Sequence, residues 1–175
     1  MTLTKTIVSL VLSAVTLAAA ASLKFDVPAG WVSKTPSSSM RLADFTLPKA
    51  ASDAEDGTVT VYYFGTGGGS VQANVDRWIG QLSQPDGRPS KDVAKTTTVE
   101  AKGGLKVTLL DVAGTYIAEV TPGSTERFNK PGFRQLAAVV ETPNGPHFVK
   151  VVGPAATVAK WEASVMAFLK SLKWE

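Results

Sequence analysis

The sequence predicts an α+β domain: a mainly antiparallel β-sheet flanked by helices, with a C-terminal helix packed on the sheet. Three observations support this prediction. Stretches rich in β-branched and aromatic residues dominate the middle of the chain. Turn signals join most of these stretches as hairpins, which makes neighbouring strands antiparallel. Two other stretches space their apolar residues with helical periodicity instead.

The first three strands are expected between residues 23 and 64. Apolar and polar residues alternate over residues 23–27, and this strand ends at Pro28. A second strand is expected over residues 40–47 and a third over residues 58–64. Both faces of the third strand become apolar toward its end, which predicts that the sheet is covered on both sides there.

Five further strands are expected in the second half of the chain. Their ranges are 96–100, 105–112, 114–120, 134–142 and 147–152. Gly103 and Gly104 separate the first two of these strands, and Asn144-Gly145 separates the last two. Both pairs are typical of β-hairpin turns, so the strands on either side should be antiparallel neighbours.

Two segments are expected to be helices. The first begins after Ser70, and the second runs from about Thr157 to the C-terminus. The apolar stripe of the first helix comprises Val71, Val75, Trp78, Ile79 and Leu82. The stripe of the second comprises Val158, Trp161, Val165, Phe168, Leu169 and Leu172. Both stripes should face the sheet, and Trp31 is expected either to cover the core or to be an exposed binding residue.

The N-terminus has the three-part form of a secretory signal peptide. Lys5 precedes an apolar run over residues 7–17, and small residues with an Ala-x-Ala site follow just before Ser22. The apolar run is shorter than the roughly 20 residues that span a bilayer. We therefore expect a signal peptide over residues 1–21, one globular domain over residues 22–175, and a secreted or periplasmic protein with no stable membrane anchor after cleavage.

Composition excludes several classes of function. The chain has no cysteine, so disulfides, thiolate catalysis and cysteine-ligated metal sites are excluded. Its formal charge is only +3 and its lysines are scattered, so no nucleic-acid partner is expected. The nearest approach to a basic cluster is Arg127, Lys130 and Arg134, which we interpret as part of a solvated Pro/Gly loop.

Several stretches together resemble a known fold. They are "LKFDVPAGW", "MRLADFTLP" and "VTVYYFG" before the first helix, then "LAAVVETPNGPHFVKVVGP" and a terminal helix ending "FLKSLKW". In this order they are similar to the PsbP/Mog1-type fold, an antiparallel sheet flanked by helices in an α/β/α sandwich. They also resemble uncharacterised secreted bacterial proteins of similar length. The resemblance implies a non-catalytic accessory or partner-binding role and transfers no functional residue.

The glycine-rich loop before the first helix does not match a nucleotide-binding motif. Gly65-Thr66-Gly67-Gly68-Gly69-Ser70 has serine where a dinucleotide fingerprint requires its third glycine, and it lacks the Gly-Lys-Ser/Thr of a P-loop. We therefore expect the glycines to turn the chain and Ser70 to cap the helix. Bare backbone amides at a helix N-terminus can still receive a small anion weakly.

This loop and the first helix form the candidate ligand or partner site. Asn74, Arg77 and Gln81 follow the spacing i, i+3, i+7 and share one helix face, either as an ordinary solvent face or as converging donors. The site residues we predict are Gly67, Gly68, Gly69, Ser70, Asn74 and Arg77.

Little in the sequence indicates catalysis, a metal or a cofactor. His147 is the only histidine, and no serine has a Gly-x-Ser-x-Gly context. Asp53, Glu55 and Asp56 form an acidic loop without the full ligand run of a calcium-binding EF-hand. We predict no catalytic residue, no metal ligand and no cofactor.

Three functions follow from these expectations. The first is an extracytoplasmic, non-enzymatic binding or accessory protein with an unknown protein partner. The second is a binder of a small anionic ligand at the glycine loop and the first helix. The third is an extracytoplasmic hydrolase whose carboxylates or triad meet only in space.

Overall fold

The computed structural model describes residues 21–175. The expected signal peptide therefore lies outside the described residues, apart from its last position. The strands are β1 (Leu23–Lys24), β2 (Val32–Lys34), β3 (Arg41–Leu47), β4 (Gly57–Tyr63), β5 (Leu82–Ser83), β6 (Lys95–Glu100), β7 (Lys106–Tyr116), β8 (Lys130–Val140), β9 (His147–Pro154) and β10 (Lys173–Trp174). The α-helices are α1 (Val71–Ile79) and α2 (Ala155–Ser171), and short 3₁₀ turns occupy Ser90–Asp92 and Lys102–Gly104.

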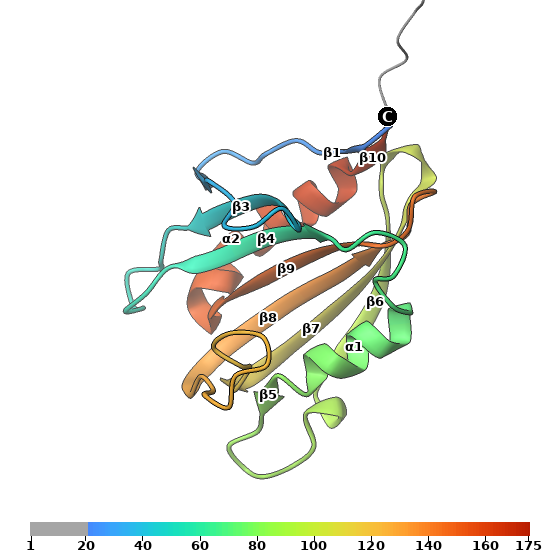
Figure 1. The fold of residues 1–175 in the computed structure, drawn as a ribbon. Helices are drawn as coiled ribbons and strands as arrows, with labels where there is room; N and C mark the ends of the chain where they lie inside the picture. Colours follow the sequence, from blue (N-terminus) through green and yellow to red (C-terminus); the bar gives the residue numbers. More distant parts are fainter. Residues whose placement is uncertain (1–20) are drawn as a thin grey trace, which may run out of the picture.

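Eight strands form one antiparallel sheet, as the sequence predicts. Its order is β2-β3-β4-β9-β8-β7-β5, and β6 also pairs with β7 (Figure 1). The two predicted hairpins are present, since β6 pairs with β7 and β8 pairs with β9. At the centre of the sheet β4 pairs with β9, so that Val61 lies opposite Val149 although the two are far apart in sequence.

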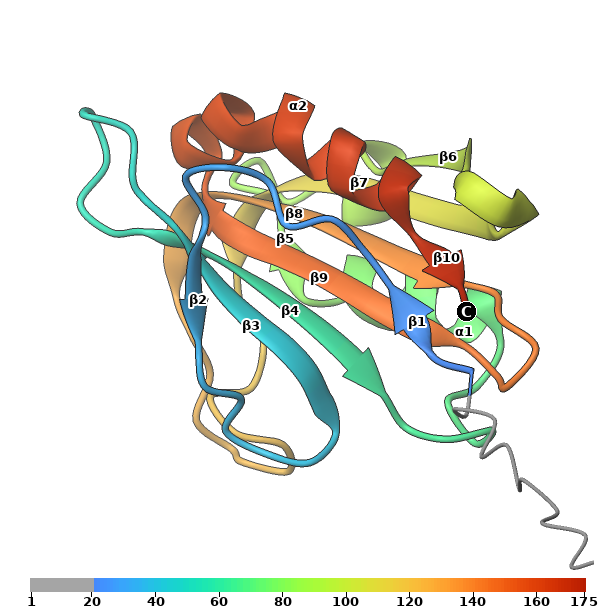
Figure 2. The ribbon, with the colours of Figure 1, turned by 90° about the horizontal axis from the view of Figure 1, so that it is seen from above.

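The two helices cover opposite faces of the sheet (Figures 1 and 2). Beneath α2 lies a large core that takes Val59 and Val61 of β4 and the inward side chains of β8 and β9. Beneath α1 lies a smaller core around Trp78, Leu110 and Phe148. The sheet is therefore covered on both sides, and the mixed α+β class with a C-terminal helix on the sheet is confirmed.

Aromatic rings close the α2 core. Phe168 of α2 is fully buried, with its ring centroid 5.0 Å from that of Phe25 and 5.2 Å from that of Trp31. Trp31 also donates from Nε1 to Ser164 Oγ at 3.0 Å. Trp31 thus covers the core and is not an exposed binding residue. Neither helix within residues 21–175 has the length and hydropathy to span a membrane.

The two ends of the described chain pair with each other. β1 and β10 form a separate two-stranded antiparallel sheet. Ser22 N–H donates to Glu175 O, and Glu175 N–H donates to Ser22 O. These backbone hydrogen bonds therefore join the last residue of the chain to Ser22.

Three expectations about the strands need correction. The first strand covers only Leu23–Lys24 and pairs with β10 outside the main sheet, because Phe25 turns into the α2 core. No separate strand runs over residues 114–120, since β7 continues to Tyr116 through a register shift after Gly114. Lys130 and Arg134 lie within β8 and not in a loop, so only Arg127 of the three basic residues lies in the loop between β7 and β8.

Arg134 is also held by two acids. It binds Asp111 through two N–H groups at 2.8 and 2.7 Å, and it donates to Glu162 of α2 at 2.7 Å. These bonds raise the pKa of its guanidinium. Arg134 is therefore a link between the sheet and α2.

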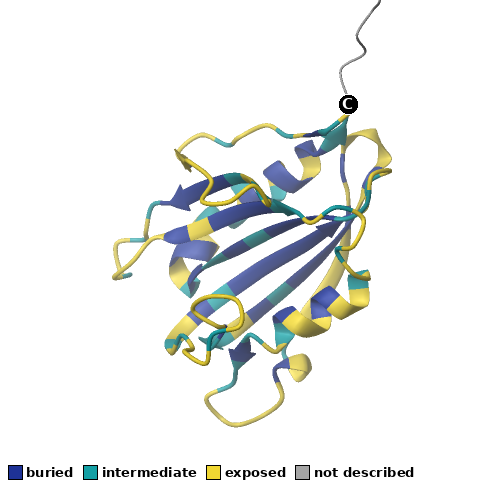
Figure 3. Ribbon diagram, viewed as in Figure 1, coloured by how far each residue is buried: buried dark blue, intermediate teal, exposed yellow. Residues whose placement is uncertain are grey.

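The burial of residues follows the layers of the fold. The central strands are buried, whereas β2 and most of the loop between β7 and β8 are exposed (Figure 3).

Candidate binding site beside α1

The glycine loop turns the chain into α1, as predicted. Gly65 and Gly69 have φ values of 70° and 80°, a left-handed conformation that residues with a Cβ rarely adopt. Ser70 is the N-cap of α1, and its Oγ accepts from Ala73 N–H at 3.1 Å. The cap satisfies one of the backbone donors that a helix start leaves free.

At Gly68 a glycine is needed because of packing and not because of the backbone conformation. A Cβ at this position would stand 2.8 Å from Cζ of Phe148 and 3.0 Å from Cγ of Pro146. The loop therefore lies directly against β9 and the β8–β9 hairpin. At Gly65 and Gly67, by contrast, a Cβ would meet no atom within 4 Å, so the backbone of the loop has an open approach at these two positions.

The structure brings Asn74 and Arg77 together with the loop. Asn74 is only 5% exposed, and its Nδ2 donates to the carbonyls of Gly68 and Ser70, both at 2.9 Å. Its Oδ1 accepts from Arg77 at 2.7 Å. Asn74 thus uses both side-chain N–H groups to hold the loop. Arg77 is exposed, and only one of its N–H groups donates to Asn74.

Lys150 joins this group from the sheet, and sequence reasoning did not single it out. Its side chain rises from β9 on the α1 side, where Nζ donates to Gln81 Oε1 at 2.6 Å and to Tyr116 Oη at 3.1 Å. Burial, and to a smaller extent the charge of Arg77, lowers the pKa of Lys150 to about 8. The sequence feature that could have identified Lys150 is that it is a single lysine within the apolar stretch over residues 148–152 of β9.

One aromatic ring, that of Tyr116, lies beside the Lys150 ammonium. Nζ lies 5.2 Å from the ring centroid of Tyr116, which stacks between Phe128 and Phe133 with centroid distances of 5.6 and 6.2 Å. Burial raises the pKa of Tyr116 to about 12, with a second contribution from Tyr62. The phenol of Tyr116 therefore stays neutral at physiological pH and is a hydrogen-bond partner, not a counter-ion.

Carboxylates nearby are engaged elsewhere. Asp44 accepts from Arg41 at 3.0 Å and from Thr60 at 2.7 Å, and Asp76 accepts from Gln72 at 2.8 Å. Among residues 21–175 neither Lys150 nor Arg77 forms an ion pair. The α1 side of the sheet therefore presents two neighbouring positive charges without an acidic partner.

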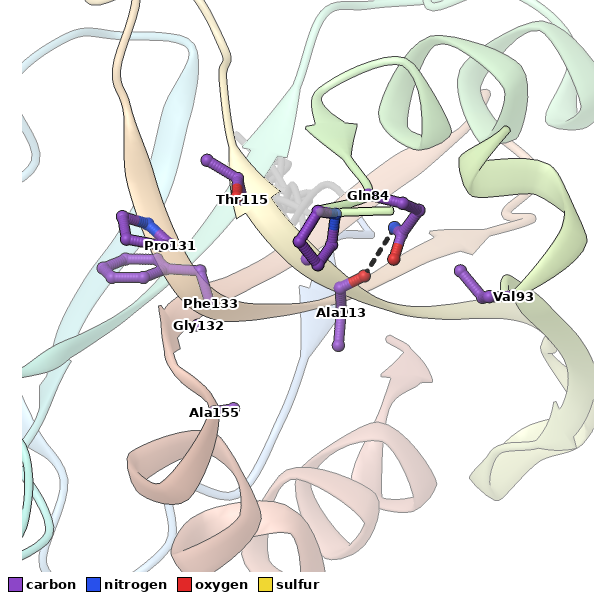
Figure 4. Close-up of a pocket in the computed structure, with 10 residues that line it drawn as sticks. Gln84, Val93, Ala113, Thr115, Pro131, Gly132, Phe133 and Ala155 are labelled. Atoms are coloured by element: carbon purple, nitrogen blue, oxygen red, sulfur yellow. Dashed lines mark hydrogen bonds between the residues drawn. The ribbon is translucent and has the colours of Figure 1, made fainter. Parts of the chain in front are cut away.

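An open cleft of about 370 Å³ lies where β7 ends and β8 begins, and Phe133, which stacks on Tyr116, is one of its lining residues (Figure 4). Gln84 lies at its edge, and its Nε2 donates to Ala113 O at 2.8 Å and to Ser90 Oγ at 3.0 Å. Pro131 and Phe133 contribute apolar surface, and none of its ten lining residues is charged. The cleft includes none of the predicted site residues.

His147 has a packing role in the structure. It is 3% exposed, and its ring stacks on Tyr63 with a centroid distance of 4.3 Å. Burial lowers its pKa. No group of three or more metal-ligating side chains is present in the part of the chain that the structure describes.

The acidic loop before β4 has a structural partner that the sequence did not reveal. Asp53 Oδ2 accepts from the backbone N–H of Thr157 at 2.7 Å and from its Oγ1 at 2.6 Å. These bonds lie in the first turn of α2, whose own N-cap residue, Pro154, makes no side-chain cap. Asp53 therefore caps α2 from a distant part of the chain.

No protein-family model matches the chain, and no curated protein matches it either. The geometry beside α1 is therefore what indicates a function. There the structure unites four predicted residues, Gly68, Ser70, Asn74 and Arg77, through hydrogen bonds, with Gly67 and Gly69 in the same loop. Lys150, Gln81 and Tyr116 extend this group across the sheet. We call Lys150, Arg77, Gln81 and Tyr116 the cationic site.

Proposed function

We propose that the chain is a secreted or periplasmic, non-enzymatic binding or accessory protein. The observation that carries this proposal is the pair of cations without an ion-pair partner in the cationic site. Partly buried charges in proteins are normally paired, because desolvation is costly. Lys150 is largely buried beside Tyr116 and has the exposed Arg77 as a further positive charge, so this site favours a partner that supplies an acidic group.

We further propose that the fold is a PsbP/Mog1-like α/β/α sandwich. An antiparallel sheet with α1 on one face and α2 on the other supports this. The resemblance implies accessory or partner-binding proteins, which agrees with a binding surface beside α1. Export is supported by the signal-peptide pattern over residues 1–21.

The proposal is tested by expressing the full chain with a C-terminal tag in a bacterial host. Export with cleavage predicts a soluble extracytoplasmic protein whose intact mass begins near Ala21 or Ser22. Partner capture from that fraction then compares the wild type with Arg77→Glu. Lys170→Glu is the matched control, because it reverses a charge on exposed α2 surface.

We expect one stoichiometric partner to bind the wild type and Lys170→Glu but not Arg77→Glu. Equal capture by all three proteins would show that binding does not use the α1 side. A mass that retains residues 1–20 would contradict the export proposal.

A small anionic ligand at the glycine loop is a second candidate. The open approach to Gly67 favours it, because a ligand can reach bare backbone there. Calorimetry with candidate anions should show weaker binding by Arg77→Ala than by the wild type. Equal binding by both proteins removes Arg77 from the site.

A further inference from the structure

We propose that the cationic site binds a single oxyanion, the carboxylate or phosphate group of a small molecule or an acidic protein side chain. This inference rests on the proposed binding function and names the chemistry of the group bound. It extends the sequence-based site from the glycine loop onto β9 and β7, where Lys150 and Tyr116 lie.

Unused donors in the cationic site are the first argument. An ammonium group has three N–H donors, and Lys150 uses two of them on Gln81 and Tyr116. A guanidinium has five, and Arg77 uses one on Asn74. Charge-assisted hydrogen bonds from both cations to one oxyanion are the strongest contacts that this set can form.

Orientation is the second argument. Gln81 follows α1 and is itself anchored, because its N–H donates to Trp78 O and its carbonyl accepts from Ile117 N–H. Asn74 holds Arg77 from the preceding turn of α1. Both cations are thus positioned by neutral partners, which leave their net charge uncompensated.

Aromatic surroundings are the third argument. The Tyr116 ring lies beside Lys150, and the rings of Phe128 and Phe133 stack on Tyr116. A second cation, Lys130, lies with its Nζ 5.5 and 5.3 Å from the centroids of these two phenylalanine rings. Low-polarity surfaces strengthen electrostatic attraction, because they exclude the water that would screen it. An oxyanion beside the Tyr116 ring is therefore held more strongly than one at an exposed lysine.

Protonation of Lys150 couples to binding. Its pKa of about 8 is set by burial and by Arg77 of α1. The other titratable groups on this face are Tyr116 of β7, Tyr62 of β4, Asp76 of α1 and the Arg41–Asp44 pair of β3, which contacts Thr60 opposite Lys150. An oxyanion favours the charged ammonium, so binding raises the pKa of Lys150 and takes up a proton near pH 8.

The test titrates the full-length exported protein with acetate, inorganic phosphate and N-acetyl-glutamate amide, at constant ionic strength set with chloride. Heteronuclear NMR follows the Lys150 Cε and Arg77 Nε resonances, and calorimetry measures affinity at about pH 6.5 and pH 8.5. We expect saturable shifts at both residues and proton uptake at the higher pH only. Acetate or phosphate binding identifies a free small anion as sufficient, whereas binding of the glutamate probe alone identifies an acidic side chain.

Two variants remove one cation each. Lys150→Met keeps an unbranched apolar side chain, and Arg77→Gln changes a residue on the exposed face of α1. Each variant should weaken binding by at least about tenfold. Lys170→Gln, on the opposite face of the sheet, should bind like the wild type.

The absence of saturable shifts for all three probes would overturn the proposed oxyanion site. It would not affect the result of the partner-capture experiment, so the oxyanion site and the proposed binding function can be contradicted independently. Unchanged affinity in both Lys150→Met and Arg77→Gln would overturn it as well. Loss of proton uptake in Lys150→Met supports it, because a purely structural lysine would not link anion binding to pH.

Discussion

At the scale of single residues, two adjacent glycines of the loop have different roles. The space for a Cβ at Gly68 is occupied by Phe148 and Pro146, whereas at Gly67 it is empty. Gly68→Ala should therefore destabilise the protein by about 1–3 kcal/mol through overpacking. Gly67→Ala should change stability by less than about 0.5 kcal/mol. Urea unfolding of both variants measures this, and equal effects would contradict the packing of the loop against β9.

Lys150 makes the stability of the folded state depend on pH. Its pKa falls from an ordinary value of 10.5 to about 8 on folding. Between these values the unfolded chain holds more protons, so stability rises with pH. The full contribution is on the order of 3 kcal/mol. Below about pH 8 the cost of burying the charge is present in full.

Comparison with Lys150→Met isolates this contribution. Tyr116 has a raised pKa and acts in the opposite direction only above about pH 10, so unfolding is measured between about pH 7 and pH 9.5. The wild type should gain stability relative to Lys150→Met across this range. A constant difference between the two proteins would show that Lys150 is not buried as a charge.

The site was only partly predictable from sequence. Ser70 and Arg77 could be identified because capping and helical spacing are local properties. Lys150 could not, because its neighbours Gln81 and Tyr116 come from segments that only the β-sheet brings together. Asn74 was predicted as a ligand donor, and the structure shows both of its N–H groups bonded to the loop.

At the scale of elements, α2 stabilises the larger core. Phe168 is fully buried and its ring meets those of Phe25, Trp31 and Phe45. Phe168→Ala should cost about 3–5 kcal/mol, because the cavity lies between α2 and β3 and cannot collapse easily. Thermal or urea unfolding measures the cost. A loss below about 1 kcal/mol would contradict the packing of α2 on the sheet.

Asp53 should stabilise the protein by about as much as an ordinary N-cap residue, because it caps α2. Asp53→Ala removes the acceptor for Thr157 N–H and Oγ1 and should cost about 0.5–2 kcal/mol. Asp53→Asn keeps an acceptor oxygen and should lose less. If the two variants were equally destabilised, the charge of Asp53 at the helix start would account for the effect instead of its hydrogen bonds.

Elements of the fold were predictable where their pattern was long. The strands of the central sheet and the existence of both helices follow from alternation and helical spacing. Both helices are shorter than predicted, because α1 ends at Ile79 before Gln81 and Leu82, and α2 ends at Ser171 and not at the C-terminus. β2, β5 and β10 were missed because two or three residues carry no periodicity. The long β7 was divided at Gly114, whose backbone lies so close to the β5 strand that a Cβ would be 2.6 Å from Ser83 O.

At the scale of the whole molecule, the two faces of the sheet differ in how firmly they are covered. α2 spans 17 residues and closes a core of many buried side chains, whereas α1 spans nine and buries only Asn74, Val75 and Trp78. Segments with few buried apolar contacts open locally before the protein unfolds globally. The cationic site is thus built on the less stable face, where Arg77 can move toward a ligand without disturbing the α2 core.

Native-state hydrogen exchange tests this difference. Amides of α1 should exchange with a lower free energy of opening than those of β8 and β9, which require global unfolding. Phe168→Ala lowers global stability and should therefore accelerate exchange in β8 and β9. It should leave α1 unchanged, because the local opening of α1 does not break the α2 core. An equal free energy of opening for α1 and the central strands, or equal acceleration of both by Phe168→Ala, would show instead that α1 unfolds only with the whole protein.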